Sequence, residues 1–456
     1  MHRDSITDYY LSTYALYLQD AFTVNRMTLN FGVRWDRQAN EALASSVPAH
    51  PFLPDWLPSV SFAGADSPVA WNDVSPRVGL NYDLTGTGKT VAKGSFAMYY
   101  GQRSPNQAVS PLNPLTAASV RFPWTDANGD GLVTRNELTL GRQNVLFFSG
   151  NYNPDDPGAL TTTGSVDPNV KNDRTREFIV GLDHELAPNL GVGFNYIWRK
   201  YDQFAWNDTL NFGSEHWAPR TFTPTAAQCP VADARCSSIR VYDPTIPIPA
   251  PYIYTNQPDR YRDYNGVELT LNKRYTNRWM GFVSVAYNDA RDHWDSPAAF
   301  EDPTNIPFLN NAQYAPESGG SGIDNIFNNA RWMFKAQGMY TMKWDINLAG
   351  FYQTRQGYPF PQALRVASRP NRGGTIDVYL DPLGEVRHPN LHYADFRVEK
   401  AFTSGTVRII PSMDIFNVGN VNTVLARRRL QAATNANQIS GIVAPRVLRF
   451  GVRINW

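Results

Sequence analysis

Apolar and polar residues alternate along many stretches of this chain with a period of two residues. The clearest examples are residues 29–36, 267–272 and 448–456, in which apolar side chains occupy every second position and polar or glycine residues lie between them. In a β-strand successive side chains point to opposite faces. The pattern therefore predicts strands with one apolar face and one polar face.

Thirteen segments fit this pattern, and many exceed the five or six residues of an ordinary strand. Consecutive segments are antiparallel if they are joined directly, so the sequence predicts a large up-and-down sheet. The predicted strands are residues 9–23, 26–37, 76–84, 90–101, 174–186, 190–201, 265–274, 279–292, 330–342, 345–356, 391–402, 407–417 and 444–456.

The connections between these segments alternate strictly between short and long. Loops as long as these are uncommon in a compact soluble domain, whereas a transmembrane β-barrel combines short periplasmic turns with long extracellular loops. The predicted fold class is an all-β, antiparallel, up-and-down transmembrane β-barrel, and a soluble sandwich or propeller is the alternative. The long connections are residues 38–75, 102–173, 202–264, 293–329, 357–390 and 418–443.

Composition agrees with this fold and narrows the function classes. Charged residues make up only 18% of the 456 residues and aromatic residues 13%, as expected for strands that face lipid and its aromatic interface. The formal net charge of +1 gives no electrostatic reason to expect a nucleic-acid partner. No run of eighteen apolar residues occurs, which excludes a membrane-spanning helix.

Residues 126–137, DANGDGLVTRNE, fill the twelve-residue template of an EF-hand-like calcium loop. Gly131 occupies the sharp turn, and the stretch lies in a predicted extracellular loop that we expect to be too long to order itself. We predict a structural calcium ion with a dissociation constant of about 0.1 to 1 mM; a solvated Asn/Gly/Asp turn is the alternative. The predicted ligands are Asp126, Asn128, Asp130, the Leu132 carbonyl, Thr134 and Glu137.

The chain has two cysteines, Cys229 and Cys236, which both fall in the long predicted loop 202–264. A close pair in a polar loop predicts a local disulfide in an oxidising compartment, with two free thiols as the alternative. We found no catalytic motif, so we do not expect an enzyme. Polar strand positions are predicted to line the lumen, among them Arg34, Asp36, Glu268, Lys273, Arg449 and Arg453.

Several segments resemble the TonB-dependent outer-membrane receptors, and the Oar-like group in particular. They are YALYLQDAFTV (14–24), LNFGVRWD (29–36), SPRVGLNYDL (75–84), GSFAMYYGQ (94–102) and the closing strand with its terminal Trp456. The resemblance implies a barrel of about 22 strands, a plug inside it, and a TonB box. Thirteen strands would then be the last thirteen, and residues 1–456 a C-terminal barrel fragment. We find no plug, TonB box or signal peptide in the sequence.

The resemblance also implies partners and a location. We expect outer-membrane lipid around the strands, the barrel-assembly machinery at Trp456, a TonB complex reached through an N-terminal region, and a large solute as cargo, in the outer membrane of a Gram-negative bacterium. The expected function is uptake of that solute. A calcium-stabilised adhesion or export-linked barrel is the first alternative, and a soluble secreted carbohydrate-binding β protein is the second.

Overall fold

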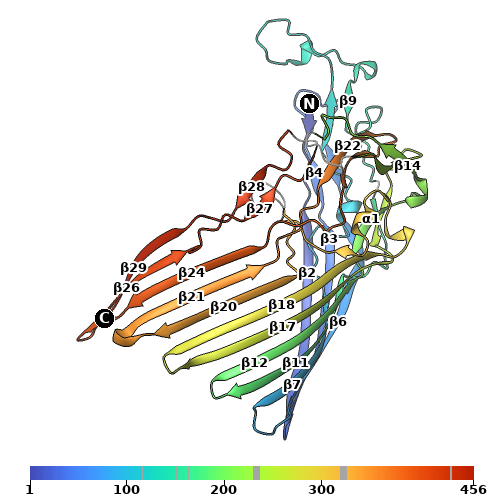
Figure 1. Cartoon of the computed structure of the whole chain (residues 1–456). Coiled ribbons are helices and arrows are strands. Elements are labelled where there is room, and N and C mark those ends of the chain that lie inside the picture. The colour runs from blue at the N-terminus through green and yellow to red at the C-terminus, as the bar shows by residue number, and fades with distance from the viewer. Residues whose placement is uncertain (116, 150–151, 163, 230–236, 319–325, 432–433) are drawn as a thin grey trace.

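One curved antiparallel sheet of 15 strands dominates the computed structural model, and the long connections form a second layer at one end of it (Figure 1). The structure describes residues 1–115, 117–149, 152–162, 164–229, 237–318, 326–431 and 434–456. Two strands of the sheet are short, β19 (Ala312–Gln313) and β25 (Phe402–Ser404). The other thirteen coincide one for one with the thirteen predicted segments, so the predicted all-β antiparallel fold is confirmed.

These thirteen strands follow one another in chain order, and each pairs antiparallel with its neighbours along the sheet. They are β2 (Tyr9–Val24), β3 (Met27–Ala42), β6 (Ala65–Asp83), β7 (Thr90–Tyr100), β11 (Arg174–Ala187), β12 (Leu190–Asp202), β17 (Arg260–Thr276), β18 (Trp279–Trp294), β20 (Trp332–Thr341), β21 (Ile346–Arg355), β24 (Leu391–Lys400), β26 (Val407–Phe416) and β29 (Val447–Asn455).

Asparagine shapes three of the short turns at the end of the sheet away from the loop layer. Asn25, Asn189 and Asn277 have φ angles of 52°, 65° and 52° and connect β2 to β3, β11 to β12 and β17 to β18. Tight hairpins require this left-handed conformation, which asparagine adopts more readily than other residues with side chains. These turns therefore fix hairpin registers locally.

The sheet does not close on itself among the described residues. In the sheet β2 pairs only with β3, and β29 pairs only with β26. Each of these outer strands has one row of backbone groups without a neighbouring strand. Figure 1 shows β2 and β29 at the two edges of the sheet.

Several strands continue past their predicted bounds at the loop end. β3 reaches Ala42 and β6 begins at Ala65, whereas the sequence pattern placed these bounds at residues 37 and 76. β17 begins at Arg260, five residues before its predicted start. Polar residues occupy both faces there, so the alternation that identified the strands fades although the hydrogen-bonded ladder continues.

The loop layer has short elements of its own. Its strands are β1 (His2–Arg3), β4 (Ser45–Val47), β5 (Val60–Phe62), β8 (Ala118–Arg121), β9 (Phe147–Phe148), β10 (Gly164–Val166), β13 (Ala205–Thr209), β14 (Trp217–Phe222), β15 (Ile239–Pro244), β16 (Tyr252–Asn256), β22 (Ala363–Arg369), β23 (Gly374–Tyr379), β27 (Val424–Arg427) and β28 (Ile439–Ile442). Its α-helix is α1 (Ile306–Leu309), and single 3-10 turns occur at Ser110–Leu112, Arg135–Glu137, Arg142–Asn144, Ser214–His216 and Pro297–Ala299. A further 3-10 turn, Lys343–Asp345, joins β20 to β21. Among the described residues no helix is long and apolar enough to cross a membrane.

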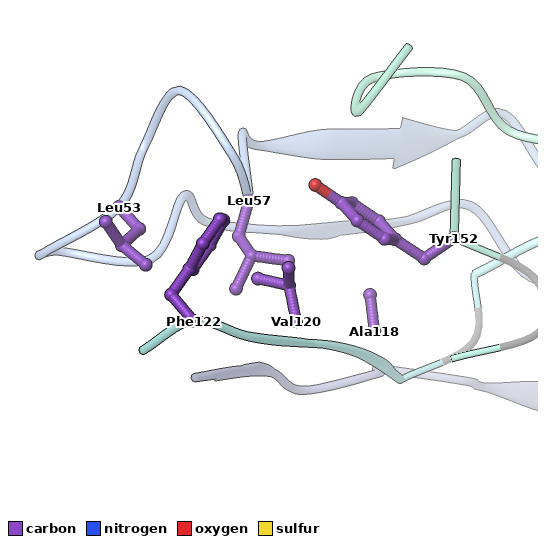
Figure 2. Packing of buried hydrophobic residues seen from close by; sticks show 6 residues of the cluster. All are labelled: Leu53, Leu57, Ala118, Val120, Phe122 and Tyr152. Atoms are coloured by element: carbon purple, nitrogen blue, oxygen red, sulfur yellow. The ribbon is translucent and has the colours of Figure 1, made fainter. Parts of the chain in front are cut away.

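The dry cores of the molecule lie in the loop layer. Leu53 and Leu57 pack against Val120 and Phe122, and the Tyr152 ring closes the same cluster (Figure 2). The Tyr152 hydroxyl donates a hydrogen bond to the Trp56 carbonyl oxygen. This cluster joins the connection 43–64 to the connection 101–173, so the longest loop is ordered by apolar packing. The described part of this loop thus packs against a second connection instead of standing alone.

Candidate functional site

The polar face of the sheet forms a charged wall, which we call the inner wall. Along β17, Glu268, Thr270 and Asn272 alternate with Leu269 and Leu271, which point to the opposite, outer face. Leu269 and Leu271 are exposed, as are large apolar residues on the same face of other strands. The sheet therefore separates an apolar surface from a polar one.

Several recesses indent the inner wall, and two of them are of similar size. One has a volume of about 600 Å³, the other of about 590 Å³. Polar residues lining the recess of about 600 Å³ include Gln19, Asn30, Arg77, Tyr99 and Glu177. Residues lining the recess of about 590 Å³ include Phe282, Gln337, Phe351, Asp395, Arg397 and Asp414. Both mix charge with aromatic rings, so the wall offers hydrogen bonds and stacking to a polar solute.

The predicted lumen residues Arg34 and Asp36 form one ion pair on β3. Arg34 Nε and Nη2 donate to the Asp36 carboxylate over 2.8 to 3.0 Å. The two residues are two positions apart, so they share one face of the strand. Arg34 also borders a recess of about 330 Å³ with Tyr17 and Gln19.

Arg449 belongs to a second charged group at the other side of the sheet. Its guanidinium lies 3.0 Å from Asp414, which also accepts a hydrogen bond of 3.1 Å from Arg397. Arg397 in turn pairs with Glu399 at 2.9 Å. Arg453 stands four residues beyond Arg449 on β29, on the same face. Four of the six predicted lumen residues thus fall into two separate groups rather than one site.

The remaining two predictions differ in outcome. Glu268 lies on the inner wall, opposite Asn195 of β12 and Ala286 of β18. Lys273 does not: it shares the outer face with Leu269 and Leu271, because the odd positions of β17 all point that way. Its ammonium stands 4.8 Å from the Trp279 ring and donates to the Arg274 carbonyl oxygen. The prediction that Lys273 lines the lumen was therefore wrong.

Sequence reasoning missed another charged group of the wall. Arg199 on β12 pairs with Glu177 on β11 at 2.5 Å, and Tyr99 donates to the same carboxylate at 3.4 Å. Arg77 stacks over the Tyr99 ring at 4.9 Å. Each of these residues occupies a polar position in a predicted strand, so the alternation could have assigned each one to the inner wall. To predict that they are neighbours, one would also need the register of the strands.

The predicted calcium loop has a compact backbone. Gly131 has a φ of +71°, as the template requires. Asp126 accepts hydrogen bonds from the Gly129 and Gly131 amides at 2.7 and 3.0 Å, and Asp130 accepts from the Leu132 amide at 2.7 Å. The Asn128 side-chain amide donates to the Asp130 carboxylate at 2.9 Å. Most side-chain oxygens of the template are thus engaged within the loop itself.

Glu137 closes the loop. The Thr134 amide and hydroxyl donate to its carboxylate at 2.9 and 2.8 Å, and these hydrogen bonds lower the pKa of Glu137 and hold it ionised. Among the described residues, however, no three acidic, histidine or cysteine side chains stand together as a group that could hold a metal ion. This conformation does not assemble the ligand set, and calcium binding stays a prediction.

Two other predicted features are only partly visible. Cys229 lies in the described structure, but Cys236 lies outside the described residues, so the predicted disulfide stays a prediction. Trp456 follows the last residue of β29 and is 91% exposed. Its role in assembly is likewise untested.

Comparison with known proteins decides the family. The family model described as "Outer membrane beta barrel domain" matches residues 2–347, from the loop layer through most of the sheet. The chain belongs to the outer-membrane β-barrel family. Its location is accordingly the outer membrane of a Gram-negative bacterium, and the exposed apolar face of this barrel chain meets lipid. The predicted fold class and location are confirmed.

Individual relatives of this outer-membrane barrel chain are distant. It is similar to the TonB-dependent transporter Oar of Myxococcus xanthus, with 24% identity over 300 residues, or 63% of the chain. The matched part is 24% of Oar, so the chain spans about a quarter of this curated relative.

Solved structures similar to this chain include a transporter and a receptor. The FrpB iron transporter from Neisseria meningitidis has 12% identity and a TM-score of 0.46, covering 98% of this chain and 44% of that one. The ferripyoverdine receptor of the outer membrane of Pseudomonas aeruginosa has 12% identity and a TM-score of 0.47, covering 98% and 39%.

Proposed function

We propose that this chain forms part of the wall of a TonB-dependent transporter that takes up a large solute across the outer membrane. The observation that carries the proposal is the two-faced sheet, in which exposed apolar residues and a charged, recessed inner wall lie on opposite sides of the same strands. The similarity to Oar, which is a TonB-dependent transporter, supports it.

Orientation follows from the two ends of the sheet. In outer-membrane barrels short turns face the periplasm and long loops face outward, so we place the loop layer at the cell surface. A solute would meet that layer first and then the inner wall. Backbone groups at the edges of β2 and β29 need hydrogen-bond partners in lipid. We therefore propose that further strands complete the wall.

The adhesion or export-linked barrel is the second candidate. The observation in its favour is the loop layer, whose separate apolar clusters give it the rigidity of a binding surface. The third alternative, a soluble carbohydrate-binding protein, does not agree with membership of an outer-membrane family.

The two membrane functions are separated by deleting the gene and following what the cells take up. Spent medium of the parent and deletion strains is compared by mass spectrometry, with and without a protonophore that removes the inner-membrane energy. Depletion of a large solute that needs both the gene and that energy supports the proposal. Unchanged depletion, together with lost attachment to a surface, would support adhesion instead.

We also propose that residues 126–137 bind calcium, because the sequence fills every position of the loop template. Binding would require Asn128 and Asp130 to turn from each other toward the ion. The loop shares its core with residues 43–64, so the test uses the full chain. Calorimetric titration should show binding with a dissociation constant of about 0.1 to 1 mM, lost in Glu137→Gln and kept in Glu215→Gln, an exposed loop glutamate. Equal heats in both variants would refute the proposal.

A further inference from the structure

On the outer face of the sheet, the side chains change from apolar to aromatic to charged in the direction from the short turns toward the loop layer. Strand registers place residues of adjacent strands in common rows across the sheet. From β7 to β20 one such row is apolar and consists of Ala92, Leu182, Phe194, Leu269, Val285 and Phe334. The next row toward the loops includes Tyr196, Val267, Tyr287 and Trp332. This is the order expected for a lipid core followed by an aromatic interface.

Two further rows complete the series. The third contains Phe178 and Trp198 and ends in Asn265 and Asp289. The fourth contains Arg176, Lys200, Asp263 and Arg291, which lie side by side on β11, β12, β17 and β18. Consecutive rows are two residues apart along each strand, or about 7 Å. A row of cations thus lies just beyond the aromatic residues on the lipid-facing side.

Neighbouring side chains enlarge this row into a band that we call the cationic band. It consists of Arg174, Arg176, Lys200, Arg291 and Arg331. The carboxylates that pair with these cations or lie opposite them across the strands are Asp202, Asp263 and Asp289, so this set has five cations and three anions and a net charge of +2. Arg174, Arg176, Arg291 and Arg331 are each between 25% and 34% exposed, so their heads are accessible from outside.

Shared carboxylates leave the guanidinium groups incompletely neutralised. Asp202 pairs with both Arg174 at 2.9 Å and Arg176 at 2.5 Å. Asp289 likewise pairs with both Arg291 at 2.9 Å and Arg331 at 3.4 Å. Each carboxylate therefore balances one of two positive charges, and both clusters keep an excess that an external anion could bind.

Lys200 stands between these two clusters. Asp263 is its cross-strand neighbour but pairs with His293 at 2.7 Å. Among the described residues Lys200 makes no ion pair, and its ammonium lies 3.9 Å from the centre of the Tyr261 ring. Tyr261 is stacked on His293 at 4.5 Å. The ammonium is thus held on the outer face with its remaining hydrogen-bond donors available.

We propose that the cationic band binds the phosphate of a membrane lipid headgroup. The band adjoins a surface that faces lipid, it carries excess positive charge, and guanidinium groups match phosphate oxygens in geometry. Free phosphate offers the same charge, but it has no acyl chain to occupy the apolar rows next to the band. This inference uses the outer face of the barrel and is independent of transport through it.

Native mass spectrometry of the full chain, purified from vesicles, measures the binding. One vesicle preparation is phosphatidylcholine alone, and the other is phosphatidylcholine mixed with phosphatidic acid, whose phosphomonoester is exposed. The chain should retain phosphatidic acid in preference to phosphatidylcholine. The triple variant Arg176→Gln, Lys200→Gln and Arg291→Gln should bind it on the order of a hundredfold more weakly at low salt.

Matched single variants keep the result interpretable if the triple variant folds poorly. Lys200→Gln should weaken retention about fivefold, because Lys200 makes no ion pair within the described residues. Lys335→Gln removes a lysine from the inner wall and should leave retention unchanged. Equal retention of both lipids, or equal losses in the two single variants, would overturn the proposal. Displacement of the lipid by an equal concentration of inorganic phosphate would assign the band to free phosphate and overturn it as well.

Discussion

The sheet and the loop layer place apolar side chains in opposite ways. In β29 Phe450 is 74% exposed and Val452 is 65% exposed, whereas Leu53 and Leu57 in the loop layer are 0% exposed. The polar residues reverse in the same manner, since the sheet turns its charges to the inner wall while the loop layer buries apolar groups beneath a polar surface. The loop layer thus folds against water, whereas the outer face of the sheet folds against lipid.

Burial has a different energetic meaning in each region. In the loop layer an apolar side chain stabilises by leaving water. In the sheet an apolar side chain on the outer face meets lipid, which is as apolar as the side chain itself. Matched substitutions in the two regions should therefore lower the free energy of unfolding by different amounts.

The largest contrast is expected between two arginines. Arg369, in the loop layer, is 8% exposed and donates to Asp302 at 2.6 Å and to the carbonyl oxygens of Tyr242 and Gly373. Arg369→Gln should destabilise the loop layer by about 3 to 5 kcal/mol, because Asp302 loses its partner. Arg449→Gln on the inner wall should cost at most about 1 kcal/mol, since Arg449 is itself largely exposed and Arg397 still pairs with Asp414. Hydrogen exchange of the two regions measures both, and equal effects would contradict the comparison.

Two leucines test the apolar side of the contrast. Leu57→Ala should cost about 2 to 5 kcal/mol, because it leaves a cavity in the cluster of Figure 2. Leu182→Ala on the outer face of β11 should cost about 0.5 kcal/mol or less, because lipid fills the space. The measurement is protease resistance of the loop layer together with urea unfolding in vesicles. A large effect of Leu182→Ala would show that its face packs against protein.

A charge inserted into β18 tests the two faces of one strand. Val285→Arg should destabilise the sheet by about 2 to 4 kcal/mol if the residue lies near the middle of the membrane. Ser284→Arg, one residue earlier and on the inner wall, should have little effect because that face is wet. Folding into vesicles can be followed by the mobility difference between folded and boiled protein on a gel. Equal costs at the two positions would mean that both faces are dry.

The smallest expected effect is a pH dependence confined to the loop layer. Burial, with smaller contributions from Arg427 and Arg355, lowers the pKa of His388 to about 4. The unfolded chain takes up this proton near pH 6.5, so its binding favours unfolding as the pH falls from about 6.5 to about 4. The free energy of local opening around residues 357–390, obtained from hydrogen exchange after division by the intrinsic exchange rate at each pH, should therefore fall over this range. In His388→Asn the slope should be smaller, and an unchanged slope would exclude His388 as its source.

The sequence predicted the sheet well for a physical reason. A strand with lipid on one side and water on the other must alternate, so each of the thirteen strands carried a local signal. Lys273 was misplaced although its odd position in β17 already assigned it to the outer face. There a lysine stem packs along apolar residues while the head reaches polar groups near the turn.

The loop layer and the charged groups were less predictable because they depend on distant contacts. The cluster of Leu53, Val120 and Tyr152 joins segments almost a hundred residues apart, and no local pattern marks it. The group of Arg199, Glu177 and Tyr99 could be predicted only with knowledge of the strand registers. The calcium template was complete in sequence, yet sequence could not show that its side chains would bond within the loop.

The hairpin turns also bear on how quickly the strands can pair. The hairpins β2–β3, β6–β7, β11–β12, β17–β18, β20–β21 and β24–β26 each close over a few residues. Such local contacts form fast, since little chain entropy is lost. β29 has no such turn: its first pair, Val447 with Phe416, must wait until the connection between them has folded back. During assembly β29 is therefore the strand whose docking we expect to be slowest.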